Sequence, residues 1–414
     1  MSTPGLATDA RAPDVTHLIG PYLARQYWAQ SALGSFGEAS VPVKVVDVEV
    51  LRSDHPGLVS MIVVSRQCTF HLVLGWRPIA TAPGMLGGRP GAVLGAAHDD
   101  GEEVLVYDAL ADEELVRLLL RAATNGHETA RRARLVGSLV SHSSLIFDDR
   151  LFMKCYRVIE PGRRPEIELM TKLDGTGFNH MLAPVAHWER QGRDLGLVRE
   201  FVPGAIEGKA LAETSLRDLL ARADKSADGA RFEDVGLAGG DFGPEMRRIG
   251  IMSARMHLAL AEAYGGAPLP PEPEAAALPV KEPAPGGVAI RIHGDYHLRR
   301  VMRTDAGWLV AGFGDDPLMG ADAGSGSQHA PRYASAVEDI ADICCSLRHV
   351  AADCLDLQPA STAAHARLLA VGWERRNVGE FLRGYLSMEG IGRLVPAERE
   401  DFDELLASSI AARS

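Results

Sequence analysis

The sequence lacks three features that would assign a protein to a specialised class. Its five cysteines are scattered and form no Cys-x-x-Cys pair, which argues against a disulfide framework or a zinc site. No run approaches ~18 apolar residues, so no membrane-spanning helix is expected. The formal net charge of −12 leaves no basic excess for general nucleic-acid binding. We therefore expect neither a nucleic-acid nor a membrane partner.

The composition is that of a folded, soluble chain. Hydrophobic residues make up 46% of the sequence and charged residues 24%, as in ordinary globular proteins. The first 20 residues contain charged side chains and two prolines but no apolar core of the kind that a signal peptide needs. A length of 414 residues is enough for two or three packed units. We expect a cytoplasmic protein.

Residues 1–130 are predicted to form a β-rich module closed by a helix. The strands of the first hairpin are rich in β-branched residues and are separated by a Ser-Asp-His-Pro-Gly turn. Strands are expected at residues 43–50, 58–64, 68–74 and 104–107. In the helix expected over 112–123, leucines recur at helical spacing and Asp112 stands at the N-cap position.

Two further segments follow this module. Residues 131–203 are predicted to form a smaller lobe, with strands at 139–146 and 151–156, a helix that begins near Pro165, and an apolar strand that ends at Val198. Residues 204–414 are predicted to form a mostly helical lobe, with helices at 211–223 and 245–263.

The helical lobe contains the most informative motif of the chain. Residues 292–297 have the sequence Ile-His-Gly-Asp-Tyr-His, and residues 312–314 have the sequence Gly-Phe-Gly. In kinases, the Asp of such a loop accepts the proton of the attacking hydroxyl, and magnesium is held by a residue five positions later and by the Asp of an Asp-Phe-Gly element. Asp295 fits the first role. Arg300 and Gly312 stand at the two metal positions, so both usual ligands are missing.

Two alternatives would compensate for the missing ligands. Asp315 or Asp316 would hold Mg²⁺ if the glycines around them let that segment turn inward. Alternatively, Arg300 would neutralise nucleotide phosphates directly through a bidentate contact. The spacing of His293 and His297 resembles that of a zinc pair, but these residues flank a loop instead of lying on a helix. We expect the two histidines to brace the loop.

The smaller lobe carries candidate nucleotide-binding residues. Lys154 lies in a predicted strand and Glu168 lies early in a predicted helix, as in the kinase pair of a phosphate-binding lysine held by a helix glutamate. Either residue alone would be taken for an ordinary exposed charge. The segment after Val198 is expected to meet the adenine base near Glu200 and Val202.

Over most of its length the chain resembles the maltokinases, members of the aminoglycoside-phosphotransferase-like kinases. The resemblance rests on the motifs above and on four further elements: Tyr-Leu-Ala-Arg-Gln-Tyr-Trp at 22–28, Val-Tyr-Asp-Ala-Leu at 106–110, Met-His-Leu at 256–258 and Glu-Asp-Ile-Ala at 338–341. It implies a mixed α/β (α+β) fold in which an N-terminal cap precedes a two-lobed protein-kinase-like structure. It also implies ATP- and Mg²⁺-dependent phosphorylation of a sugar, of the maltose or aminosugar class.

The resemblance also points to a nucleotide loop and to departures from the family pattern. The Ser-His-Ser-Ser stretch matches the family's nucleotide loop, so Ser141, Ser143 and Ser144 would contact the nucleotide. The family's C-terminal sugar-site elements have no counterpart after Pro396, which predicts a shortened C-terminus. Two functions therefore stay open: an ATP-dependent sugar phosphotransferase, and a pseudokinase with a regulatory or docking role and a protein partner.

Overall fold

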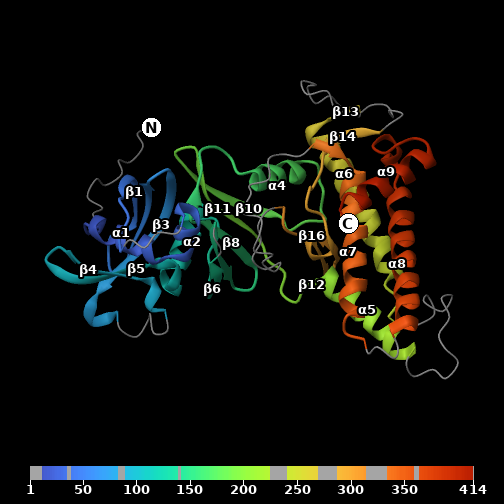
Figure 1. The fold of residues 1–414 in the computed structure, drawn as a ribbon. Coiled ribbons are helices and arrows are strands. Elements are labelled where there is room, and N and C mark those ends of the chain that lie inside the picture. The colour runs from blue at the N-terminus through green and yellow to red at the C-terminus, as the bar shows by residue number, and fades with distance from the viewer. Residues whose placement is uncertain are drawn as a thin grey trace. The chain divides into compact units, whose positions relative to one another are not determined.

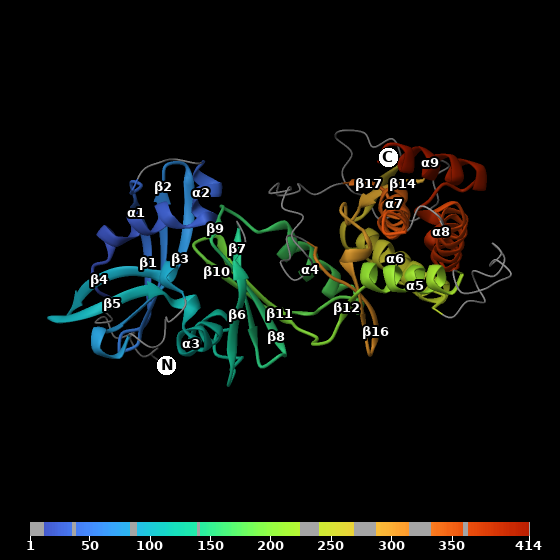
Figure 2. The same cartoon turned by 60° about the horizontal axis from the view of Figure 1, so that its bottom comes forward.

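The computed structural model describes residues 12–34, 39–82, 89–138, 141–223, 240–268, 287–313, 333–358 and 363–413. They form two compact units (Figures 1 and 2). Unit 1 comprises the described residues up to Ile167 together with Pro184–Pro203, and unit 2 comprises Glu168–Ala183 and the described residues from Gly204 onward. In these ranges no helix is long and apolar enough to cross a membrane.

Unit 1 contains two antiparallel sheets. The strand order of the first sheet is β1-β2-β3-β5-β4, and β9 also pairs with β3. The order of the second is β10-β11-β8-β7-β6. The strands of the first sheet are β1 (Lys44–Arg52), β2 (Gly57–Ser65), β3 (Cys68–Pro78), β4 (Val93–Asp99), β5 (Glu102–Asp108) and β9 (Val158–Ile159). Those of the second are β6 (Ala133–Ser138), β7 (His142–Phe147), β8 (Leu151–Tyr156), β10 (Pro184–Arg190) and β11 (Arg193–Glu200).

The predicted first hairpin is confirmed. Strands β1 and β2 pair antiparallel, with Val48 opposite Met61. Strand β2 lies between β1 and β3 and is almost continuously apolar, in keeping with its burial along most of its length. The core of this unit includes Trp28, Phe70 and Trp76.

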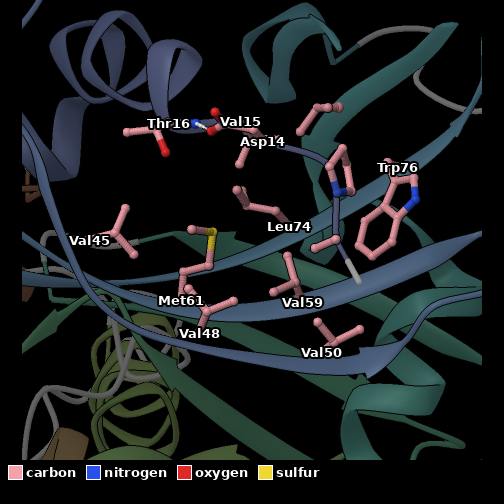
Figure 3. Close-up of a pocket in the computed structure, with 13 residues that line it drawn as sticks. Asp14, Val15, Thr16, Val45, Val48, Val50, Val59, Met61, Leu74 and Trp76 are labelled. Carbon is pink, nitrogen blue, oxygen red and sulfur yellow. Dashed lines mark hydrogen bonds between the residues drawn. The ribbon is translucent and has the colours of Figure 1, made fainter. Parts of the chain in front are cut away.

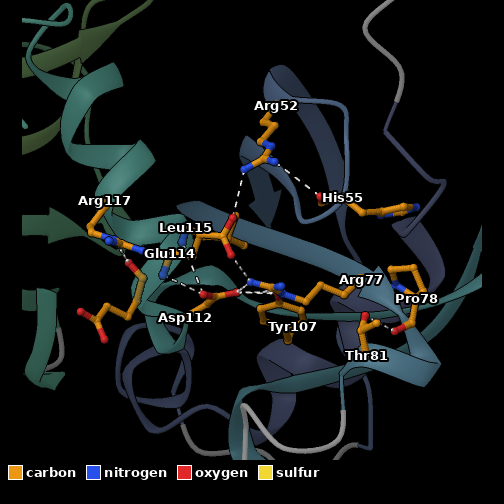
Figure 4. Close-up of polar contacts among 11 residues, drawn as sticks. Arg52, His55, Arg77, Pro78, Thr81, Tyr107, Asp112, Glu114, Leu115 and Arg117 are labelled. Atoms are coloured by element: carbon orange, nitrogen blue, oxygen red, sulfur yellow. Dashed lines mark hydrogen bonds and ion pairs between the residues drawn. The ribbon is translucent and has the colours of Figure 1, made fainter. Parts of the chain in front are cut away.

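Three helices complete unit 1: α1 (Thr16–Arg25), α2 (Tyr27–Leu33) and α3 (Glu113–Ala123). The prediction that Asp112 caps the last of these is confirmed, since its Oδ1 accepts hydrogen bonds from the backbone N–H groups of Glu114 and Leu115. Its Oδ2 accepts from the Tyr107 hydroxyl at 2.7 Å and from the Arg77 guanidinium at 2.9 Å (Figure 4). One buried carboxylate thus joins the start of α3 to strands β3 and β5.

Unit 2 is built mainly from helices α5 (Gly208–Ala223), α6 (Gly243–Tyr264), α7 (Val337–Leu355), α8 (Ala363–Leu386) and α9 (Arg399–Ala411). The predicted helices at 211–223 and 245–263 correspond to α5 and α6. Helices α6 and α8 lie side by side and approach closely at two glycines (Figure 1). A Cβ atom at Gly250 would lie 2.1 Å from the Phe381 carbonyl oxygen, and one at Gly384 would lie 2.1 Å from that of Arg247. Only glycine fits at these two positions.

Two small sheets and a helix at the unit boundary complete the described elements. The order of one sheet is β12-β15-β16 and that of the other is β13-β14-β17. Their strands are β12 (Ile206–Glu207), β15 (Val301–Thr304), β16 (Gly307–Val310), β13 (Gly266–Pro268), β14 (Val288–Arg291) and β17 (Tyr333–Ser335). Helix α4 (Pro165–Gly175) contains the boundary between the two units. The division into a cap and two lobes at residues 130 and 203 stays a prediction.

Candidate functional site

A buried carboxylate anchors the His-Gly-Asp loop of unit 2. Asp339 on α7 accepts hydrogen bonds from the backbone N–H groups of His293 at 2.8 Å and Gly294 at 2.9 Å. Its Oδ2 also lies 3.0 Å from Nε2 of His257 on α6, whose Nδ1 lies 2.7 Å from the Tyr385 hydroxyl on α8. Asp339 and His257 are fully buried. Three helices therefore hold the loop in place through one connected polar network.

Asp295 follows this anchored segment and is paired with a cation. The Nη2 of Arg300 donates a hydrogen bond to Oδ2 of Asp295. On the other carboxylate oxygen, Oδ1 of Asp295 lies 3.5 Å from Nε2 of His297. Partial burial raises the pKa of Asp295, but the charge and hydrogen bond of Arg300 outweigh it, so the net pKa is below the ordinary value. A carboxylate with a lowered pKa is a weaker proton acceptor.

Arg300 and Gly312, which stand at the two usual magnesium-ligand positions, lie next to each other in the structure. The β15–β16 hairpin pairs Val301 with Val310, and the Ala311 N–H donates to the Arg300 carbonyl at 2.7 Å. Gly312 has a φ of +82°, and a Cβ atom there would lie 2.8 Å from Arg300 Nη1 and 3.1 Å from its Cδ. The Arg300 side chain thus occupies the space that a side chain at position 312 would need, while its guanidinium reaches Asp295.

The two histidines of the motif make contacts within their own loop. His293 Nδ1 accepts from the Asp295 N–H at 3.3 Å, and His297 Nδ1 accepts from the Arg299 N–H at 3.2 Å. Burial lowers the pKa of His293 to about 4, which keeps its ring neutral at pH 7. Among the described residues, no cluster of three or more His, Cys, Asp or Glu side chains forms a metal site. Asp315 and Asp316, the predicted alternative ligands, lie outside the described residues.

In unit 1, the Lys154 ammonium is buried and ion-paired. Its Nζ lies 2.6 Å from Oε1 of Glu166 on α4. The prediction that Glu168 forms this pair is wrong, because Glu168 lies 3.5 Å from Lys172 in an (i, i+4) pair instead. Successive helix residues are rotated by ~100°, so residues two positions apart point to nearly opposite sides of the helix. With Glu166 directed at Lys154, Glu168 faces away.

The predicted serines are divided between the two faces of the second sheet. Ser144 pairs across strands with Lys154 and therefore shares its face. Its hydroxyl is buried and has no hydrogen-bond partner in the described part of the chain. Ser143 points to the opposite face, where its Oγ accepts from Arg157 Nε at 2.9 Å and lies 2.8 Å from that of Ser138. Ser141 Oγ lies 2.9 Å from Nδ1 of the neighbouring His142.

The predicted base-binding segment follows β11. Glu200 is the last residue of this strand, pairs with Leu151 in the register and has an exposed side chain. The Phe201 N–H donates to the Arg150 carbonyl at 2.8 Å, and Val202 is partly buried. The contacts of Glu200 and Val202 with a nucleotide stay a prediction.

A buried cluster joins the two sheets of unit 1, and the sequence analysis did not identify it. Asp108 Oδ2 accepts hydrogen bonds from the Tyr22 hydroxyl at 2.9 Å and from the guanidinium of Arg157. Arg157 is 2% exposed and also donates to Ser143, within the Ser-His-Ser-Ser stretch. The only signal in the sequence was that Tyr22 and Asp108 both fall in elements that resemble the maltokinases.

Unit 1 also contains a cavity of about 420 Å³ (Figure 3). It lies between residues 12–16 and the inner side chains of the first sheet, among them Val59, Met61, Leu74 and Trp76. Most of the residues that line it are apolar, and the polar residues Asp14 and Thr16 also contribute to its walls. Of the predicted nucleotide-binding and catalytic residues that the structure describes, none lines this cavity.

Comparisons with known proteins show the fold. No protein-family model matches the chain. The chain is similar to a glucosamine kinase solved in complex with glucosamine, ADP and inorganic phosphate, with 18% sequence identity, a TM-score of 0.58, and coverage of 97% of this chain and 93% of that chain. A second crystal form of glucosamine kinase matches with 19% identity, a TM-score of 0.56 and the same coverage. The chain therefore has a mixed α/β, two-lobed kinase-like fold.

Proposed function

We propose that the protein is a pseudokinase of the sugar-kinase type, which keeps the kinase fold but has lost magnesium-dependent phosphoryl transfer. The pairing of Arg300 with Asp295 carries this proposal, because it places a fixed cation on the residue that would act as the base. In this proposal the protein works as a regulatory or docking component with a protein partner.

The physical argument concerns both the metal and the base. Magnesium requires oxygen ligands, and neither glycine nor arginine supplies a side-chain oxygen at the two usual positions. A divalent cation ~4 Å from Arg300 would be repelled by roughly 8 kcal/mol at an effective dielectric constant near 20. The lowered pKa of Asp295 also weakens its ability to accept a proton from a sugar hydroxyl. Base and metal site are therefore impaired by the same side chain.

Elements expected to bind phosphate are retained. The Lys154–Glu166 pair has the character of the kinase pair that positions a nucleotide's phosphates. Beside Lys154, Ser144 presents a buried hydroxyl that has no hydrogen-bond partner among the described residues. We propose that these groups bind ATP weakly, and that the Arg300 guanidinium takes over the neutralisation of phosphate charge that Mg²⁺ would provide.

A second candidate function is ATP-dependent phosphorylation of a sugar, of the maltose or aminosugar class. The similarity to glucosamine kinase over 97% of the chain favours it. Asp295 would then act as the base, and Asp315 or Asp316 would hold Mg²⁺. This function requires Arg300 to release Asp295 when the substrates bind.

A kinase assay separates the two candidates. The purified full-length chain is incubated with ATP, Mg²⁺ and a panel of free sugars that includes maltose and glucosamine, and ADP release is measured. We expect no sugar-dependent release above that of Asp295→Asn. Turnover with any sugar that Asp295→Asn abolishes would establish the second candidate and contradict the pseudokinase proposal.

A further inference from the structure

Two buried side chains lie between the residues predicted to hold the two ends of a nucleotide. In unit 1, Lys154 pairs across strands with Leu197, and Phe152 pairs with Arg199. Alternate residues of a strand point to the same face and lie ~7 Å apart, so Phe152 and Arg199 form the next row on the face of Lys154. The segment predicted to meet the base begins directly after Arg199, at Glu200. A base bound there would have to lie along this row.

The row is already filled. Phe152 is completely buried and Arg199 is 4% exposed. The Arg199 guanidinium stacks on the Phe152 ring with its Cζ 4.3 Å from the ring centroid, and its Nη1 donates to the Glu200 carbonyl at 3.1 Å. Ile146, which pairs with Phe152 on the other side, is also buried. A flat heterocycle binds in an apolar cleft. Here the Phe152 ring and the planar Arg199 guanidinium stacked on it fill the space where such a cleft would be.

We infer that Phe152 and Arg199 take the place of the nucleotide base, so that the site binds a phosphate chain and gains nothing from an attached nucleoside. The ligand class is an inorganic or otherwise base-free polyphosphate, held by Lys154 with Ser144 beside it. This inference rests on the proposed function, since it takes Lys154 as the phosphate-binding group. It explains why ATP would bind weakly even though the Lys154–Glu166 pair is intact.

Calorimetric titration of the full-length protein tests the inference, with ATP and inorganic tripolyphosphate as probes and chelator present throughout. For wild type we expect the two dissociation constants to agree within ~3-fold. Phe152→Ala should open the slot, tightening ATP binding by ~10-fold or more while leaving tripolyphosphate binding unchanged. Met153→Ala is the matched control, because Met153 is equally buried but points to the opposite face of β8. It should change neither constant.

Three results would overturn the inference. The first is wild-type binding of ATP ~10-fold or more tighter than tripolyphosphate, because the base would then contribute to affinity. The second is a ratio of the two constants that Phe152→Ala does not change. The third is the absence of tripolyphosphate binding. If Phe152→Ala does not fold, Phe152→Leu is used in its place. The comparison of ATP with tripolyphosphate binding to the wild-type protein tests the inference without any variant. The pseudokinase proposal is tested separately, by the kinase assay: sugar-dependent turnover there would contradict that proposal.

Discussion

Sugar-dependent ADP release is expected to appear when Arg300→Gln and Gly312→Asp are combined. The double substitution removes the cation from Asp295 and returns two oxygen-bearing side chains to the positions that usually hold magnesium. It also removes the contact that excludes a Cβ atom at position 312, since that atom would otherwise lie 2.8 Å from Arg300 Nη1. The positive φ of Gly312 is among the conformations that Asp tolerates better than most residues. General-base catalysis by the released Asp295 alone would raise the rate by ~10²- to 10⁴-fold.

The single variants and an arginine control make this result specific. Gly312→Asp alone should stay inactive because its side chain meets Arg300, and Arg300→Gln alone lacks one ligand. Arg303→Gln removes a partly exposed arginine from the same hairpin and should have no effect. If the double variant folds and binds Mg²⁺ and ATP but transfers nothing, the loss lies in sugar positioning, which supplies ~7–11 kcal/mol of such barriers. That outcome would contradict the account in which the metal site alone was lost.

Asp339→Ala is expected to lower the free energy of unfolding by about 3–5 kcal/mol, because it removes a fully buried carboxylate from its partners. Two backbone N–H groups of the His-Gly-Asp loop and the ring of His257 would be left without their acceptor. Chemical denaturation followed by far-UV circular dichroism measures the change. The matched control is Asp353→Ala on the same helix, whose exposed pair with Lys209 should contribute at most ~1 kcal/mol.

The contribution of Asp339 also has a defined pH dependence. Burial raises its pKa, but the hydrogen bond and charge of His257 and the contacts of the loop outweigh it, so the pKa in the folded state is lowered. A carboxylate with a lowered folded-state pKa stabilises the protein above its unfolded pKa, near 4, and loses that contribution as the pH falls below it. Wild type and Asp339→Ala should therefore converge in stability in acid. Equal stability of Asp339→Ala and Asp353→Ala at pH 7 would show that the network does not hold the loop.

Local patterns predicted much of the fold. The β-branched runs around the turn at residues 53–57 and the leucine spacing after Asp112 were sufficient for the first hairpin and for α3, because both elements are determined by near neighbours in the sequence. Near neighbours in the sequence could not determine whether Glu166 or Glu168 pairs with Lys154. Both lie in the first turn of one helix, and only the tertiary structure shows that Glu166 is the one that reaches Lys154.

The candidate site was predictable only in part, for the same reason. The motif indicated Asp295, Arg300 and Gly312, but the sequence gives no distance between positions 300 and 312, which the β15–β16 hairpin brings together. Asp339 is 46 residues from His293, so its role as the anchor of the loop depends on tertiary structure. Phe152 resembled an ordinary core residue until its register with Arg199 placed it beside Lys154.

The magnesium dependence of ATP binding tests most directly whether Arg300 has replaced the metal. ATP is titrated calorimetrically into the wild-type protein in saturating magnesium and, separately, in excess chelator. We predict weak binding with dissociation constants that agree within ~3-fold between the two conditions. A gain of ~10-fold or more with magnesium would contradict the account, because a carboxylate would then be holding the metal, with Asp315 and Asp316 as the first residues to substitute.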